Sequence, residues 1–146
     1  MFALHQVQIG EDLTAICDQM QPGEWAADNE MTSYQLDPLK KFLEAGGILV
    51  LAQDGDSIAG AALCYELPYP AGQHSLYVHE LDTHPDYRRQ GVATQLVDEA
   101  KKIAKAHGLI EVWIGTETDN DPANALYKAL KPFEIEPSLI YAYKVN

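Results

Sequence analysis

The fold of this chain is decided near its middle, by the stretch Asp86-Tyr87-Arg88-Arg89-Gln90-Gly91-Val92-Ala93. Before it, residues 76–81 alternate apolar and polar side chains, as a half-buried strand does. After it, apolar residues recur at three- and four-residue spacing over 92–104, which predicts one apolar stripe on a helix. A strand, a glycine turn and a helix N-terminus together present unpaired backbone N–H groups and the positive end of the helix dipole to a ligand. The stretch therefore predicts a pyrophosphate site, in which Gly91 lets the phosphate approach and the two arginines add charge at the rim.

Length and composition favour a single domain over residues 1–146. The chain is 47% hydrophobic and 22% charged, values typical of a globular protein. No apolar run reaches the ~20 residues that span a bilayer, and residues 1–5 lack the features of a signal peptide. Cys17 and Cys64 lie far apart among apolar neighbours, which favours buried free thiols. We therefore expect a cytoplasmic protein with no membrane partner.

The charge balance narrows the class of partner. The formal net charge is −12, and before Arg88 the basic residues are Lys40 and Lys41 alone. A nucleic-acid-binding protein normally carries a basic face, so no nucleic-acid partner is expected. An acidic surface attracts cationic acceptors such as polyamines or amino sugars, although it also serves solubility.

Helix and strand signals follow one another along the chain in the order βααβββαβαββ. The expected strands are 3–8, 48–53, 58–67, 76–81, 109–116, 133–135 and 139–145, and the helices are 12–20, 37–45, 92–107 and 121–131. The helix after residue 36 is expected to start at Asp37-Pro38. The turn Asp54-Gly55-Asp56-Ser57 predicts a hairpin between the strands 48–53 and 58–67. This order predicts an α/β (α+β) fold, a mixed central sheet of about six to seven strands flanked by about four helices. A doubly wound dinucleotide fold is disfavoured, because its glycine turn would follow the first strand.

Two motifs resemble one known superfamily. The form Arg88-x-x-Gly91-x-Ala93 resembles the acetyl-CoA signature of the GNAT superfamily of N-acetyltransferases. Residues 119–130, which include Asn120 and end in the helix carrying Leu126-Tyr127, are similar to its second signature. Over 76–130 the closest resemblance is to aminoglycoside 3-N-acetyltransferases. The resemblance covers nearly the whole chain and implies the GNAT fold, acetyl-CoA as cofactor, and direct transfer of acetyl to a primary amine of a small cationic acceptor.

The same resemblance implies which residues hold the cofactor. The pantetheine arm would pair, as an added strand, with the backbone around Leu81 and Thr83. The pyrophosphate would contact the turn and the first helical turn, and the thiol arm and nucleotide would lie against the later helix. The residues that would contact the pyrophosphate are Arg88, Arg89, Gln90, Gly91, Val92, Ala93 and Thr94. The residues that would lie against the thiol arm and nucleotide are Asn120, Ala123 and Lys128.

Acetyl transfer to an amine also requires proton transfers. Glu80 is the candidate base, and strand alternation places Asp82 on the same face as a second candidate and His79 on the opposite face. The backbone N–H of Leu81 would stabilise the oxyanion. Tyr127 would protonate the departing thiolate, while packing in the core is its alternative role.

Several alternatives stay open on sequence grounds. No metal site is expected, because the five-residue spacing of His74, His79 and His84 does not match a helical ligand pair. Trp25 and Tyr34 either anchor a loop or line an acceptor pocket with Glu24, Asp28 and Glu30. Acetylation of a protein N-terminus or lysine, and a non-catalytic acetyl-CoA sensor, are the rival functions. Tyr141 and Tyr143 are compatible with either a core or the seam of a homodimer.

Overall fold

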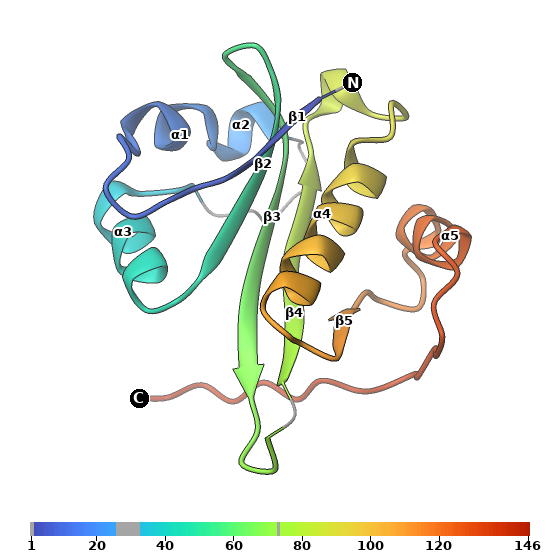
Figure 1. Cartoon of the computed structure of the whole chain (residues 1–146). Coiled ribbons are helices and arrows are strands. Elements are labelled where there is room, and N and C mark those ends of the chain that lie inside the picture. The colour runs from blue at the N-terminus through green and yellow to red at the C-terminus, as the bar shows by residue number, and fades with distance from the viewer. Residues whose placement is uncertain (1, 26–32, 73) are drawn as a thin grey trace. The chain divides into compact units, whose positions relative to one another are not determined.

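The computed structural model describes residues 2–25, 33–72 and 74–146. They belong to two compact units, Met1–Gly115 and Thr116–Asn146 (Figure 1). The first unit contains β1 (Ala3–Gln6), α1 (Thr14–Gln19), α2 (Pro22–Trp25), α3 (Leu36–Glu44), β2 (Ile48–Asp54), β3 (Ser57–Pro68), β4 (His74–Thr83), the 3-10 helix η1 (Pro85–Tyr87), α4 (Val92–Ala106) and β5 (Glu111–Ile114). The second unit contains α5 (Asp121–Ala129).

The strands of the first unit form one mixed sheet in the order β1-β2-β3-β4-β5. β1 to β4 are antiparallel neighbours, and β5 runs parallel to β4. The predicted mixed sheet is therefore confirmed, as are the hairpin at 54–57 and the long helix after Gly91. The described residues contain five strands, fewer than the six to seven expected.

The missing strands are those predicted at 133–135 and 139–145, and this prediction is wrong for the structure. Residues 131–146, all of them described, form neither helix nor strand. Their apolar side chains, including Phe133, Leu139 and Tyr141, are exposed. Alternation of apolar and polar residues indicates only that a segment suits a strand, because a strand exists through hydrogen bonds to a neighbour.

The start of α3 also differs from its prediction. The helix begins at Leu36 after an extended Gln35, so Asp37 lies in the first turn and is not the cap. An acidic residue there is favourable because the helix N-terminus is electropositive. Pro38 is tolerated because the N–H groups of the first turn have no intrahelical partners.

Two apolar layers cover the two faces of the sheet, with α4 on one face and α1–α3 on the other (Figure 1). The stripe of α4 packs Leu96, Ala100 and Ile103 against the sheet, as its spacing predicts. Trp25 and Met20 are buried in the other layer. Cys17 and Cys64 are buried free thiols. Within the described ranges, no helix is long and apolar enough to cross a bilayer.

Candidate functional site

The predicted strand–turn–helix unit is present at the end of β4. Gly91 is the N-cap of α4, with a left-handed backbone (φ 82°), and no side chain in the described part of the chain caps the helix. Among the described residues, a Cβ at Gly91 would come within 4 Å only of Gln95 Nε2, at 3.8 Å, so these residues leave the space beside it open. The N–H groups of Val92, Ala93 and Thr94 have no intrahelical acceptors, because they belong to the first turn. The turn therefore fits an anionic group, and binding of pyrophosphate there stays a prediction.

Neighbouring side chains hold this turn in place. The Tyr87 hydroxyl donates to Asp54 Oδ2 (3.2 Å) at the end of β2, and the ring of Phe2 lies edge-on to Tyr87 at 5.7 Å. The N–H of Asp86 donates to His84 Nδ1 (3.2 Å), and Gln90 Nε2 donates to the Asp86 carbonyl (3.2 Å). Arg88 and Arg89 are exposed. The turn is thus held by its neighbours while its arginines face solvent.

A β-bulge interrupts β4 beside the candidate base. Cys64 pairs with Val78 and Leu63 pairs with Glu80, so His79 is an extra residue on β4. The His79 ring lies near the rings of Tyr65 (5.8 Å) and Tyr77 (5.5 Å), on the face that Glu80 shares. The prediction that His79 faces away from Glu80 is therefore wrong, because a bulge breaks strict alternation.

Two carboxylates lie on one face of β4, as the alternation of strand residues predicts. Asp82 pairs with Ala61, which is buried in the layer under α1–α3, and Glu80 pairs with Leu63 two residues further along β3. Burial raises the pKa of Glu80, the negative charge of Asp82 raises it further, and His79 partly opposes this. A carboxyl with a raised pKa is a better match for proton transfer near neutral pH than an exposed one.

Tyr34 lies on the same side of the sheet as these carboxylates. It packs against the layer under α1–α3, and its hydroxyl is buried with no hydrogen-bond partner among the described residues. Burial raises the pKa of Tyr34, and the charges of Glu80 and Asp82 raise it further. The Tyr34 phenol therefore remains protonated, and the charges of both carboxylates act on it.

Of the two alternatives for Trp25, the structure supports the anchor. Trp25 is 1% exposed, its Nε1 donates to the Gln19 carbonyl (2.8 Å), and its ring lies edge-on to His84 at 5.4 Å. The side chain of Glu24, together with Asp28 and Glu30, lies outside the described residues. Sequence reasoning did not single out the aromatic residues Tyr65, Tyr77 and Trp113, whose shared face follows from strand register alone.

β4 and β5 pair only over part of their length. The register joins Ser75 to Glu111 and ends with Val78 opposite Ile114. Beyond Val78, the β5-facing edge of β4 has no strand partner among the described residues, and this edge includes the backbone of Leu81 and Thr83. Such an edge is suited to pairing with an extended ligand.

The remaining predicted residues lie on the second unit. Asn120 caps α5, with its Oδ1 accepting from the Ala123 N–H (3.3 Å). Tyr127 is half-buried and Lys128 is exposed on the same helix. Their roles toward a cofactor stay predictions, and the capping contact gives Asn120 a structural role as well.

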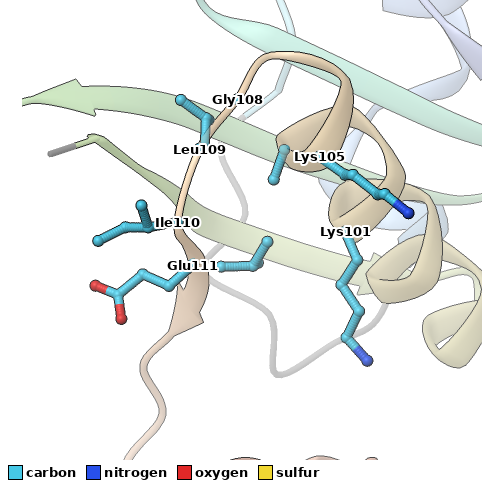
Figure 2. Close-up of a pocket in the computed structure, with 8 residues that line it drawn as sticks. Lys101, Lys105, Gly108, Leu109, Ile110 and Glu111 are labelled. Carbon is cyan, nitrogen blue, oxygen red and sulfur yellow. The ribbon is translucent and has the colours of Figure 1, made fainter.

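A pocket of about 380 Å³ lies elsewhere in the first unit (Figure 2). It lies between the C-terminal half of α4 and the segment 108–112, with Lys101 and Lys105 on its helical side. Lys101 is ten residues from Gly91, roughly 15 Å along the helix. The pocket includes none of the predicted site residues.

Comparison with known proteins adds to this geometry. The chain is 31% identical over 80 residues to N-alpha-acetyltransferase 30 of Schizosaccharomyces pombe, which covers 55% of the chain and 53% of that relative. It is 42% identical over 52 residues to aminoglycoside N(6')-acetyltransferase type 1 of Acinetobacter genomosp. 13, covering 36% of each. The matched part thus spans about half or less of these curated relatives.

A solved structure shares the fold over nearly its full length. It is the aminoglycoside acetyltransferase meta-AAC0020, from an uncultured soil metagenomic sample, in complex with sisomicin, with a TM-score of 0.86 and 19% identity over 99% of this chain and 97% of that one. The family model described as "Acetyltransferase (GNAT) family" matches residues 13–131. We call the turn 88–91 and the first-turn N–H groups of α4 the cradle. With this cradle and its mixed sheet, the chain belongs to the acetyltransferase (GNAT) family.

Proposed function

We propose that this chain transfers acetyl from acetyl-CoA to a primary amine of a small cationic acceptor, by direct attack. One observation carries the proposal: the open cradle at the start of α4 lies next to the end of β4 that holds the carboxylate pair. A Cβ on Gly60 would touch both Val92 Cγ1 and the Asp82 carbonyl oxygen, so these two groups flank the same point of β3. Membership of an acetyltransferase family supports the same reaction.

The residues present fit acetyl-CoA. The first-turn N–H groups of α4, with Arg88 and Arg89, would hold the pyrophosphate, as helix N-termini do. The unpaired edge at Leu81 and Thr83 would hydrogen-bond the amides of the pantetheine arm. When bound, acetyl-CoA supplies a thioester carbonyl that an amine can attack. Gln90, Asn120, Ala123 and Lys128 are the further residues proposed to contact it.

The proton transfers and the oxyanion are assigned to groups of this chain. Glu80 would accept the proton that the ammonium group of the acceptor must lose, with Asp82 as the alternative base. The Leu81 N–H would donate to the developing oxyanion. Tyr127 would give a proton to the departing thiolate. The family match over 13–131 covers most of the first unit and the α5 part of the second, which supports their acting as one domain of the catalyst.

The acceptor we propose is an aminoglycoside-like or polyamine-like cation. The net charge of −12 favours a cationic ligand, and the structural neighbour meta-AAC0020 has been solved with sisomicin and with trehalose. The sequence motifs resemble 3-N-acetyltransferases, whereas one relative is an aminoglycoside N(6')-acetyltransferase. The chemical structure of the acetylated product would show which amine of an aminoglycoside is modified.

A second candidate is acetylation of a protein N-terminus. It is favoured by the 31% identity over 80 residues to N-alpha-acetyltransferase 30. Both candidates share the cofactor residues and differ in the acceptor, so one assay separates them.

The test is thiol release from acetyl-CoA across aminoglycosides, polyamines and short peptides, with calorimetric titration of acetyl-CoA. Turnover of one of the first two classes is the expected result. Turnover of peptides alone would favour the second candidate. Acetyl-CoA binding without turnover of any amine would indicate a sensor and overturn the proposal.

A further inference from the structure

Three aromatic side chains cross the sheet at one level. Tyr65 on β3 pairs with Tyr77 on β4, and Tyr77 pairs with Trp113 on β5. The rings of Tyr77 and Trp113 are stacked, with centroids 4.2 Å apart and planes 23° apart. Directly paired residues share a face of the sheet, so Tyr65, Tyr77 and Trp113 form one surface, which we call the aromatic ladder.

The His79 ring joins the ladder to the carboxylate pair. It bridges Tyr65 and Tyr77, and its Nδ1 lies 3.1 Å from the Tyr77 hydroxyl oxygen. Glu80 follows His79 on the same face, because of the bulge. At ~3.3 Å per residue, the ladder and Glu80 are separated by roughly 10 Å along β4.

The ladder is not a buried core. Trp113 is 41% exposed and Tyr65 is 39% exposed, while Phe42 supports Tyr65 from α3 through an edge contact at 5.3 Å. Large, rigid rings that are supported on one side and open on the other are typical of binding surfaces.

We infer that the aromatic ladder binds the ring scaffold of a polycationic acceptor, placing one of its amines at Glu80. This rests on the proposed function and names the class of its substrate: an extended amine built on rings, such as an amino sugar. The faces of tyrosine and tryptophan attract ammonium groups and also pack against the apolar face of a saturated ring. The acidic pair at Glu80 and Asp82 supplies the complementary charge at the reacting end. A linear amine can reach Glu80 without using the ladder.

The matched variants are Trp113→Ala, Trp113→Phe and Tyr69→Ala. Tyr69 is an exposed aromatic (47%) on the β3–β4 connection, outside the ladder, and serves as the control. KM and kcat are measured with sisomicin, which carries rings, and with spermidine, a linear triamine. Trp113→Ala should raise KM for sisomicin about tenfold and leave kcat within twofold. Trp113→Ala should leave KM and kcat for spermidine within twofold of the wild-type values. Trp113→Phe should have a KM for sisomicin close to that of the wild type.

Binding without turnover is measured separately. Trp25 is buried, so the response of the tryptophan fluorescence to sisomicin should come from Trp113 and disappear in Trp113→Phe. Calorimetric titration with sisomicin, without acetyl-CoA, should show about tenfold weaker binding to Trp113→Ala and unchanged binding to Tyr69→Ala.

The outcomes separate the inference from the proposed function. An unchanged sisomicin KM and affinity in Trp113→Ala, or equal losses for sisomicin and spermidine, would overturn the ladder as a ring-binding surface. If the wild-type chain acetylates no amine, the proposed function fails. In that case the titration still decides the ladder: sisomicin binding that depends on Trp113 supports it, and absent or Trp113-independent binding refutes it.

Discussion

Gly60 on β3 lies directly against Val92 at the start of α4. A Cβ at Gly60 would overlap Val92 Cγ1 and come within 2.9 Å of the Asp82 carbonyl oxygen. The missing side chain therefore allows helix, β3 and β4 to meet closely beside the cradle.

Gly60→Ala should destabilise the fold by about 1–3 kcal/mol, because the added methyl group meets backbone as well as a side chain. Gly23→Ala is the control, since a Cβ there meets none of the described residues within 4 Å. Chemical denaturation of both variants measures the effect. Equal stability of the two would mean that α4 shifts freely on the sheet.

Gly91→Val should abolish measurable acetyl-CoA binding, because the side chain would occupy the space next to the first-turn N–H groups. Gly46→Val introduces the same kind of backbone strain at a positive φ of 94°, at the end of α3 and outside the site. Calorimetry should therefore show lost affinity only for Gly91→Val. If both variants bind acetyl-CoA equally well, the cradle is misassigned.

Glu80→Gln should lower kcat by about 10²-fold and move the pH optimum upward, because the amine must then lose its proton without a side-chain base. In the wild type, the raised pKa of Glu80 keeps it protonated to higher pH than an exposed carboxyl, so activity should fall on the acidic side. Rate–pH profiles of Glu80→Gln and Asp82→Asn distinguish the two candidates. A profile altered only in Asp82→Asn assigns the base to Asp82.

The same pKa shift has a consequence for stability. A carboxyl whose pKa is raised by folding stabilises the fold at low pH, and this contribution is lost as pH rises through the folded-state value. Glu80→Gln should therefore gain melting temperature relative to the wild type at pH 8 but not at pH 4. Thermal unfolding of both proteins at the two pH values measures this, and an equal difference at both would contradict it.

Tyr34→Phe should keep or raise the melting temperature, because the deleted hydroxyl is buried without a described partner. Tyr87→Phe is the comparison, since it removes the hydrogen bond to Asp54 and should cost about 0.5–1.5 kcal/mol. Thermal unfolding of the pair tests this, and a larger loss in Tyr34→Phe would be the opposite of the expected result.

Tyr127→Phe should lower kcat at least tenfold while acetyl-CoA affinity stays nearly unchanged, because the phenol is proposed to act only on the departing thiolate. Steady-state kinetics and calorimetry measure the two quantities. Tyr141→Phe, on the exposed C-terminal segment, should behave as the wild type. Full activity in Tyr127→Phe would return this side chain to a packing role.

Local signals predicted most of the first unit. The stripe of α4, the hairpin at Gly55 and the glycine turn at Gly91 each depend on neighbours within a few residues, and each is present. The turn that carries Arg88 and Arg89 was located for the same reason.

Contacts between distant residues could not be predicted in this way. Two strands were expected in 131–146 from alternation, but pairing depends on a neighbouring strand that a local pattern does not specify. The prediction that His79 faces away from Glu80 was wrong because β4 has a bulge at His79, and a bulge depends on how β4 pairs with β3.

By itself, then, the sequence determined the order of the strands and longer helices in the first unit, the family motifs and the glycine turn, because these follow from periodicity and backbone preference over short spans. The short helices α2 and η1 were not predicted. Only the tertiary structure decided that the half-buried side chains of Glu80, Asp82 and Tyr34 lie on the side of the sheet covered by α1–α3. It also decided that Tyr65, Tyr77 and Trp113 form one surface. Those relationships arise from strand register and helix packing, which join residues far apart in the chain and depend on the whole sheet being formed.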